Sequence, residues 1–323
     1  MSPQQQGGPA NGHGRTADKP SDIPKRGWKD ILLRVKDDLS RDNTSLLAAG
    51  AAFYAFLAIP SAITAVVSLY GLIFNSQDVR GQVQAMQGVM PGEAIALISG
   101  QLGKLTSHSN ETLGLGLIIS VLVSLWSTQS GTSSMMKALD IAYGEAEKRG
   151  FFRFYSTAFA LTVATVLFVL VALALIAVLP AIIGLLPLGE FGKAIAAAVR
   201  WPVLICMIMA VLAVIYRYAP SREEPRWRWV SWGAVTATAL WILSSALFSI
   251  YVSRFAHYDK SYGSLGAVVV LLMWLYLSSY SVLLGAELNA EIEHQTARDS
   301  TTGREQPMGQ RGARMADTLG KER

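Results

Sequence analysis

Five residues have side chains that could form a partly buried polar cluster with an ion pair. Glu287 and Asn289 stand directly behind a long apolar run, and Arg153, Arg217 and Asp140 stand near the ends of other apolar runs. A carboxylate and a guanidinium that are partly withdrawn from water interact more strongly than a surface pair. We therefore expect Glu287 to pair with Arg153 or Arg217 at the inner mouth of a helix bundle. Asn289 is expected to be hydrogen-bonded nearby, and Asp140 is a further member of the same cluster.

Glu287 also has a simpler interpretation. The 24 residue steps from Gly263 to Glu287 make about 36 Å of helix, against a hydrocarbon core about 30 Å thick. The carboxylate would then stand at the inner boundary and enter water, with Glu291 and Glu293 following on a solvated turn. The sequence leaves open whether a pair at this position is structural only or also gates transport.

Two polar or helix-breaking residues lie inside apolar runs. The amide of Gln129 needs hydrogen-bonding partners at that depth, so it either joins two helices or lines a polar path. Pro60, in "FLAIPSA", kinks a membrane span and frees a carbonyl group. This kink serves either packing or, as the sharper alternative, a gating hinge.

The sequence contains no recognisable catalytic or metal-binding motif. Its four histidines have no metal-ligand spacing, and we expect them to be ordinary exposed side chains. The single cysteine, Cys206, is expected to be a small packing residue inside a span. No enzyme activity, metal or cofactor is therefore expected.

The elements that must position these residues are membrane-spanning helices. The 323 residues are 51% hydrophobic and only 16% charged, against about 25% charged in an ordinary soluble domain. A span needs about 20 predominantly apolar residues, and the sequence predicts six of them. The prediction is an all-α polytopic membrane protein with a six-helix domain at 25–294 and spans at about 46–74, 113–136, 154–186, 198–218, 230–253 and 263–286.

The basic residues predict the orientation. With a cytoplasmic N-terminus, 22 of the 28 lysines and arginines fall in inside segments, so the positive-inside rule places both termini in the cytoplasm. These residues are divided among four segments with no interleaved stacking aromatics, so nucleic acid is not an expected partner. Trp227, Trp229 and Trp232 are expected at the membrane interface.

Three kinds of flanking segment complete the prediction. A basic amphipathic helix begins at residue 25 and lies either on the inner leaflet or against the cytoplasmic end of the bundle; its apolar residues are Trp28, Leu32, Val35 and Leu39. The loop at 78–111 is expected to hold two short outer amphipathic helices, used as a lid or as structural cover. Residues 1–24 and 295–323 have the composition of disordered cytoplasmic tails.

Four separated motifs resemble a known family. "YGSLGAVVVLLMWLYLSSYSVLLGAELNAEIE", "AAGAAFYAFLAIP", "KALDIAYGEAEKRGFFR" and "IYRYAPSREEPRWRWVSWGA" are similar, in the order of that family's elements, to segments of the YihY/virulence factor BrkB family. The resemblance covers about residues 28–293 and implies a six-helix protein of the bacterial inner membrane. Asp140 departs from the pattern, because the family is expected to have asparagine there.

The resemblance leaves the biochemical activity open. The family has carried the label ribonuclease BN, but this sequence lacks the metal cluster that such hydrolysis requires. One hypothesis is the transport or flipping of an amphipathic envelope molecule, such as an anionic lipid. The alternative is a non-catalytic scaffold for an envelope assembly, with membrane lipids, envelope proteins or a second copy of the chain as partners.

Overall fold

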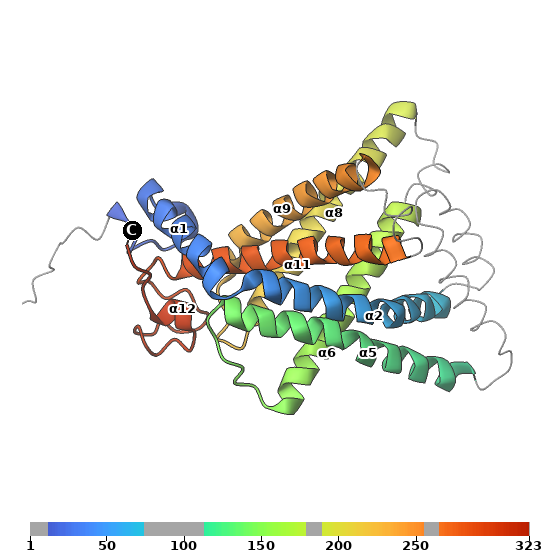
Figure 1. Cartoon of the computed structure of the whole chain (residues 1–323), viewed down its shortest axis with the longest axis horizontal. Coiled ribbons are helices and arrows are strands. Elements are labelled where there is room, and N and C mark those ends of the chain that lie inside the picture. Colours follow the sequence, from blue (N-terminus) through green and yellow to red (C-terminus); the bar gives the residue numbers. More distant parts are fainter. Residues whose placement is uncertain (1–11, 74–112, 179–188, 255–264, 323) are drawn as a thin grey trace, which may run out of the picture. The chain divides into compact units, whose positions relative to one another are not determined.

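The computed structural model describes residues 12–73, 113–178, 189–254 and 265–322. The helices predicted at 78–111 lie outside these residues. The described helices are, in chain order, η2 (Pro20–Asp22), α1 (Lys25–Arg41), α2 (Thr44–Ile73), α5 (Leu113–Ala142), α6 (Phe151–Leu173), α8 (Glu190–Tyr218), α9 (Trp227–Arg254), α11 (Leu265–Glu293) and α12 (Arg314–Asp317) (Figure 1). A π-helical turn at Ala174–Val178 continues α6.

Long apolar helices dominate the described chain, and the expected all-α polytopic class is confirmed. Within the described residues, five helical segments are long and apolar enough to cross a membrane: Thr44–Ala62, Phe151–Ile176, Ala198–Tyr218, Trp227–Ser253 and Val268–Glu293. The remaining predicted span, 113–136, falls on α5, which is 30 residues long. α2 is one helix through Pro60, so the proline does not divide it.

The chain divides into two compact units. Unit 1 comprises Met1–Phe53, Ser134–Phe154 and Met209–Arg323, and unit 2 comprises Tyr54–Ser133 and Tyr155–Ile208. In unit 2, Leu125 of α5 and Val166 of α6 form a small buried cluster. Elsewhere along the same two helices, the hydroxyl groups of Thr132 and Thr162 are hydrogen-bonded at 2.8 Å.

Unit 1 is built on the antiparallel pair of α9 and α11, which lie side by side (Figure 1). Two reciprocal hydrogen bonds join the helices: Trp241 donates to Ser278 at 3.0 Å, and Trp274 donates to Ser245 at 3.1 Å. Near the start of α9 and the end of α11, a Cβ added to Gly285 would lie 2.6 Å from the carbonyl oxygen of Gly233. The two backbones are therefore in contact there. Small residues permit such close approach in membrane helix pairs.

α1 packs against the end of this pair with one face. Ile31 and Val35 form a buried cluster with Trp229, Leu288 and Ile292. The sequence left open whether this helix lies on the inner leaflet or packs against the bundle. Its buried face packs against the ends of α9 and α11. At the start of α9, the side chain of Trp229 is buried in the protein with 1% exposed, whereas Trp227 and Trp232 are 48% and 43% exposed.

Residues 295–322 fold over the same end of unit 1 and are not the disordered tail that their composition predicts. The backbone N–H groups of Arg226 and Thr302 donate to Ser300 and Glu224, each at 2.9 Å, around an isolated β-bridge. The Arg311 side chain donates to four carbonyl groups, those of Ala297, Arg298, Gln306 and Ala316. The composition did not predict that the segment is folded, because hydrogen bonds rather than an apolar core hold it in place.

Candidate functional site

Arg217, one of the two predicted partners of Glu287, contacts other groups. Arg217 donates to the carbonyl oxygen of Pro225 at 2.6 Å and pairs with Glu224 at 2.9 Å. Glu287 is 1% exposed and accepts a hydrogen bond from the hydroxyl group of Thr44 at 3.4 Å. Arg153 lies exposed on the first turn of α6. Of the two predicted pairs, the one between Glu287 and Arg217 is therefore wrong, and Glu287 is fully buried rather than partly withdrawn from water.

Asn289 joins α11 to the first turns of α9. Its Oδ1 accepts from the N–H group of Gly233 at 2.7 Å, and its Nδ2 donates to the carbonyl oxygen of Val230 at 3.1 Å. The amide is 1% exposed and satisfies two backbone groups at the point where the helices touch. Asn289 is hydrogen-bonded as the sequence predicts, but to backbone groups of α9.

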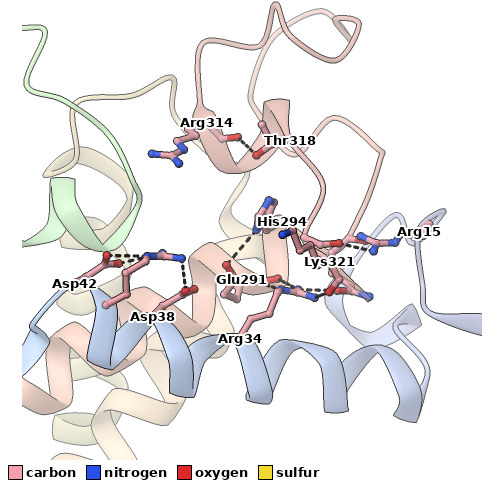
Figure 2. Close-up of polar contacts among 12 residues, drawn as sticks. Arg15, Arg34, Asp38, Asp42, Glu291, His294, Arg314, Thr318 and Lys321 are labelled. Carbon is pink, nitrogen blue, oxygen red and sulfur yellow. Dashed lines mark hydrogen bonds and ion pairs between the residues drawn. The ribbon is translucent and has the colours of Figure 1, made fainter. Parts of the chain in front are cut away.

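Arg34 of α1 is a buried cation that the sequence analysis missed. Its Nε donates to Glu291 and its Nη2 to Gln295 Oε1 at 2.7 Å, while Nη1 reaches the carbonyl oxygen of Lys321 at 3.0 Å. Figure 2 shows Arg34 between Glu291 and Lys321, with His294 on the other side of Glu291. The helical spacing of Arg34 with the buried Ile31 and Val35 was the signal that could have revealed it.

Arg222 and Glu293 form the second missed ion pair. Two parallel hydrogen bonds of 2.6 and 2.7 Å join the guanidinium to the carboxylate, and the two side chains are 0% and 2% exposed. Ser300 also donates to Glu293, and the ring of Tyr143 lies 5.1 Å from the guanidinium. Burial disfavours the charge, but Glu293 holds the pKa of Arg222 above its usual value. The expected solvated turn at Glu291 and Glu293 is therefore wrong.

Two histidines contact buried carboxylates of α1 and α11. His13 Nδ1 lies 2.6 Å from Asp30, and His294 Nδ1 lies 3.1 Å from Glu291. The expectation that they are ordinary exposed side chains is wrong, since both are largely covered. Cys206 lies, as expected, in a helical segment apolar enough to cross a membrane, but its side chain is exposed on α8 and is not a packing residue.

Asp140 anchors the loop that follows α8. Its Oδ1 accepts from the backbone N–H of Ser221 at 2.6 Å, and the Arg149 guanidinium lies 3.9 Å from Oδ2. Asp140 lies four residues beyond the predicted span 113–136 and is 4% exposed. Burial raises the pKa of its carboxyl group to about 7; the negative charge of Glu147 adds to this effect, whereas the Ser221 bond and Arg149 oppose it.

The raised pKa predicts a pH-dependent stability. The folded protein holds a proton on Asp140 up to about pH 7, whereas the unfolded chain loses it near pH 4, so stability falls as pH rises between these values. Asp140→Asn imitates the protonated form. We expect this variant to gain several degrees in Tm at pH 8 and almost none at pH 4, measured by thermal unfolding in detergent. Asn at the exposed Asp22 should leave the pH profile unchanged; an Asp140→Asn profile that parallels the wild type would contradict the account.

Gln129 and Ser133 place unpartnered polar atoms on one face of α5. They are four residues apart and 4% and 8% exposed. Among the described residues, Gln129 Oε1 and Ser133 Oγ have no hydrogen-bond partner. An unpaired buried polar atom costs about 1–3 kcal/mol. The helix-joining interpretation of Gln129 therefore lacks a partner for its carbonyl oxygen.

The described part of the chain contains no cluster of three or more His, Cys, Asp or Glu side chains that could hold a metal ion. The buried polar residues described above form ion pairs and hydrogen bonds at one end of unit 1. In unit 2, Gln129 and Ser133 form a polar face on α5. The molecule is an α-helical, multi-pass membrane protein with polar side chains retained among apolar helices.

The chain belongs to the virulence factor BrkB family, whose model matches residues 35–309. The ribonuclease-like protein YfkH of Bacillus subtilis is 35% identical over 224 residues, which cover 68% of this chain and 78% of that protein. A UPF0761 membrane protein of Idiomarina loihiensis is 36% identical over 104 residues, 32% of this chain and 36% of the relative. No solved structure gives a significant match.

Proposed function

We propose that this protein moves an amphipathic envelope molecule, such as an anionic lipid, across the bacterial inner membrane. The observation that carries the proposal is the pair of unpartnered polar atoms on α5, Gln129 Oε1 and Ser133 Oγ. A scaffold gains nothing from such atoms, because a leucine or alanine would pack without the desolvation cost. A transporter uses them as transient partners for water or for a headgroup that passes along the helix.

Accessibility to water tests this polar face. In a Cys206→Ser background, a cysteine at Ser133 should react with a permanently charged thiol reagent in lipid nanodiscs. Leu125→Cys is the matched control, since Leu125 is 6% exposed but belongs to the apolar cluster with Val166. Equal protection of both cysteines would mean a dry, close-packed face and would favour the scaffold.

The name of YfkH suggests a second function, ribonuclease activity. In hydrolases of that kind, a metal ion held by histidine and acidic side chains activates the attacking water. Such a cluster is absent from the described residues, so no feature of that part of the chain favours this function. We therefore propose transport, with no nucleic acid as substrate.

Both termini are proposed to lie in the cytoplasm. Besides the distribution of basic residues, a structural contact supports termini on one side: the N–H of Ala297 donates to the carbonyl oxygen of Arg15 at 2.8 Å. Ends that meet require an even number of crossings, which agrees with six spans when α5 is added to the five apolar segments.

Cysteine labelling tests this orientation in intact cells. With Cys206→Ser as background, Gly88→Cys in the predicted outer loop should react with an impermeant reagent. Arg304→Cys, on an exposed residue of the C-terminal segment, should react only after permeabilisation. Labelling of position 304 in intact cells would reverse the orientation.

A further inference from the structure

α1 has a second face that is not used in packing. Lys25, Lys29, Leu32 and Lys36 follow one another at spacings of four, three and four residues, which places them on one side of the helix. All four are exposed, and Leu32 is 58% exposed. A leucine among lysines whose long stems can cover apolar surface is typical of helices that lie in a membrane interface.

The start of α9 extends this face. The rings of Trp28 and Trp232 lie 5.3 Å apart, and Trp232 is 43% exposed. Arg228 is also exposed and stands one turn before Trp232 on the same side of α9. We call the combined region the α1–α9 basic surface; it comprises Lys25, Trp28, Lys29, Leu32, Lys36, Arg228 and Trp232.

The contacts of α1 place this surface at the depth where the spans end. The apolar segment of α9 begins at Trp227, and that of α11 ends at Glu293. α1 contacts Trp232 near its first residue, and Thr44, just beyond its last residue, contacts Glu287. The hydrogen bond between Gly233 and Asn289 shows that the start of α9 and the end of α11 lie at the same level. Since one end of α1 is near α9 and the other is near α11, α1 lies across the pair. Tryptophan and basic residues anchor membrane proteins at this level.

The first turn of α1 adds a preference for anions. It contains Lys25 and no acidic residue, and no side chain caps its N–H groups. The positive end of the helix dipole and a lysine there repel each other unless an anion lies nearby. Asp37 is exposed on α1 but lies about 120° from Lys25 around the helix axis, outside the lysine face.

We propose that the α1–α9 basic surface binds the anionic headgroups of the leaflet in which α1 lies. Neutral lipid would cover Leu32 and Trp232 equally well, but it would bring no net negative charge to the three lysines and Arg228. An anionic headgroup satisfies the cations and the start of α1 together. This binding is separate from the transport proposed above, because it needs no passage through the bundle.

A fluorescence quenching experiment on the full-length protein tests the proposal. Leu32→Cys, in a Cys206→Ser background, is labelled with an environment-sensitive fluorophore in nanodiscs of mixed phosphatidylcholine and phosphatidylglycerol. A quencher on the same acyl-chain carbon is attached to one lipid or to the other. We expect the anionic lipid to quench about twofold more than the neutral one.

Charge variants give the decisive comparison. The triple variant Lys25→Gln/Lys29→Gln/Lys36→Gln should bring the quenching ratio to about one. Lys19→Gln/Arg304→Gln/Lys321→Gln removes as many exposed cations elsewhere and should leave the ratio unchanged. A ratio of one in the unaltered surface, or an equal loss in both triple variants, would overturn the proposal. A ratio of one together with a spectral shift on adding soluble polyglutamate would instead assign the surface to an acidic protein segment.

Discussion

Replacing Gly233 by alanine should destabilise the protein by about 2–4 kcal/mol. The added Cβ would overlap the carbonyl oxygen of Gly285 and the side-chain amide of Asn289. α9 and α11 would have to move apart. The two hydrogen bonds from Asn289 to α9 would then be lost, because they need the close approach of the helices. Thermal unfolding of the purified protein in detergent measures the effect.

Gly50→Ala is the matched control. An added Cβ at Gly50, also inside a long helix, meets nothing within 4 Å. Alanine there should stabilise by about 0.5–1 kcal/mol, because glycine is costly in a helix interior. Equal Tm values for the two alanine variants would show that the contact between α9 and α11 is looser than described.

Breaking the Arg222–Glu293 pair should have the other large effect. Arg222→Met leaves a carboxylate buried with Ser300 as its remaining donor, and the loss of one member of a buried pair costs about 3–5 kcal/mol. The double variant Arg222→Met/Glu293→Met removes both charges and should be more stable than either single variant. Strict additivity of the single effects would mean that the two charges do not interact.

Glu287 provides a comparison with Glu293. Glu293→Gln disrupts a two-bond ion pair, whereas Glu287→Gln keeps an acceptor for Thr44. Glu293→Gln is therefore expected to lower Tm more than Glu287→Gln does. An exposed pair, Asp18–Arg298, supplies the baseline: Asp18→Asn should change Tm very little.

The fold class could be predicted from the sequence because apolar runs of sufficient length have few other uses. Glu287 and Asn289 were also recognisable as unusual, since they follow such a run directly. The residues with which Glu287 and Asn289 form hydrogen bonds could not be predicted. Which arginine meets which carboxylate depends on how the loop at 218–226 and the segment at 295–322 fold, and these segments have no periodic pattern.

The order of the C-terminal segment was hidden for a related reason. Arg311 and Arg34 fix it through backbone carbonyl groups, and every residue type supplies a carbonyl. Composition therefore cannot distinguish this segment from a disordered one. Arg34 itself was recognisable in principle, because a cation on the buried face of an amphipathic helix needs a partner.

A lipid translocation assay tests the proposed transport most directly. Proteoliposomes carry a trace of fluorescent phosphatidylglycerol, and dithionite bleaches the fluorophores of the outer leaflet, with and without an imposed ion gradient. The account predicts bleaching well beyond the half seen in protein-free vesicles, and its loss in Gln129→Leu, which removes the unpartnered carbonyl of α5. Bleaching that stops at the protein-free level under every condition, for anionic and zwitterionic lipids alike, would contradict it and leave the scaffold as the better account.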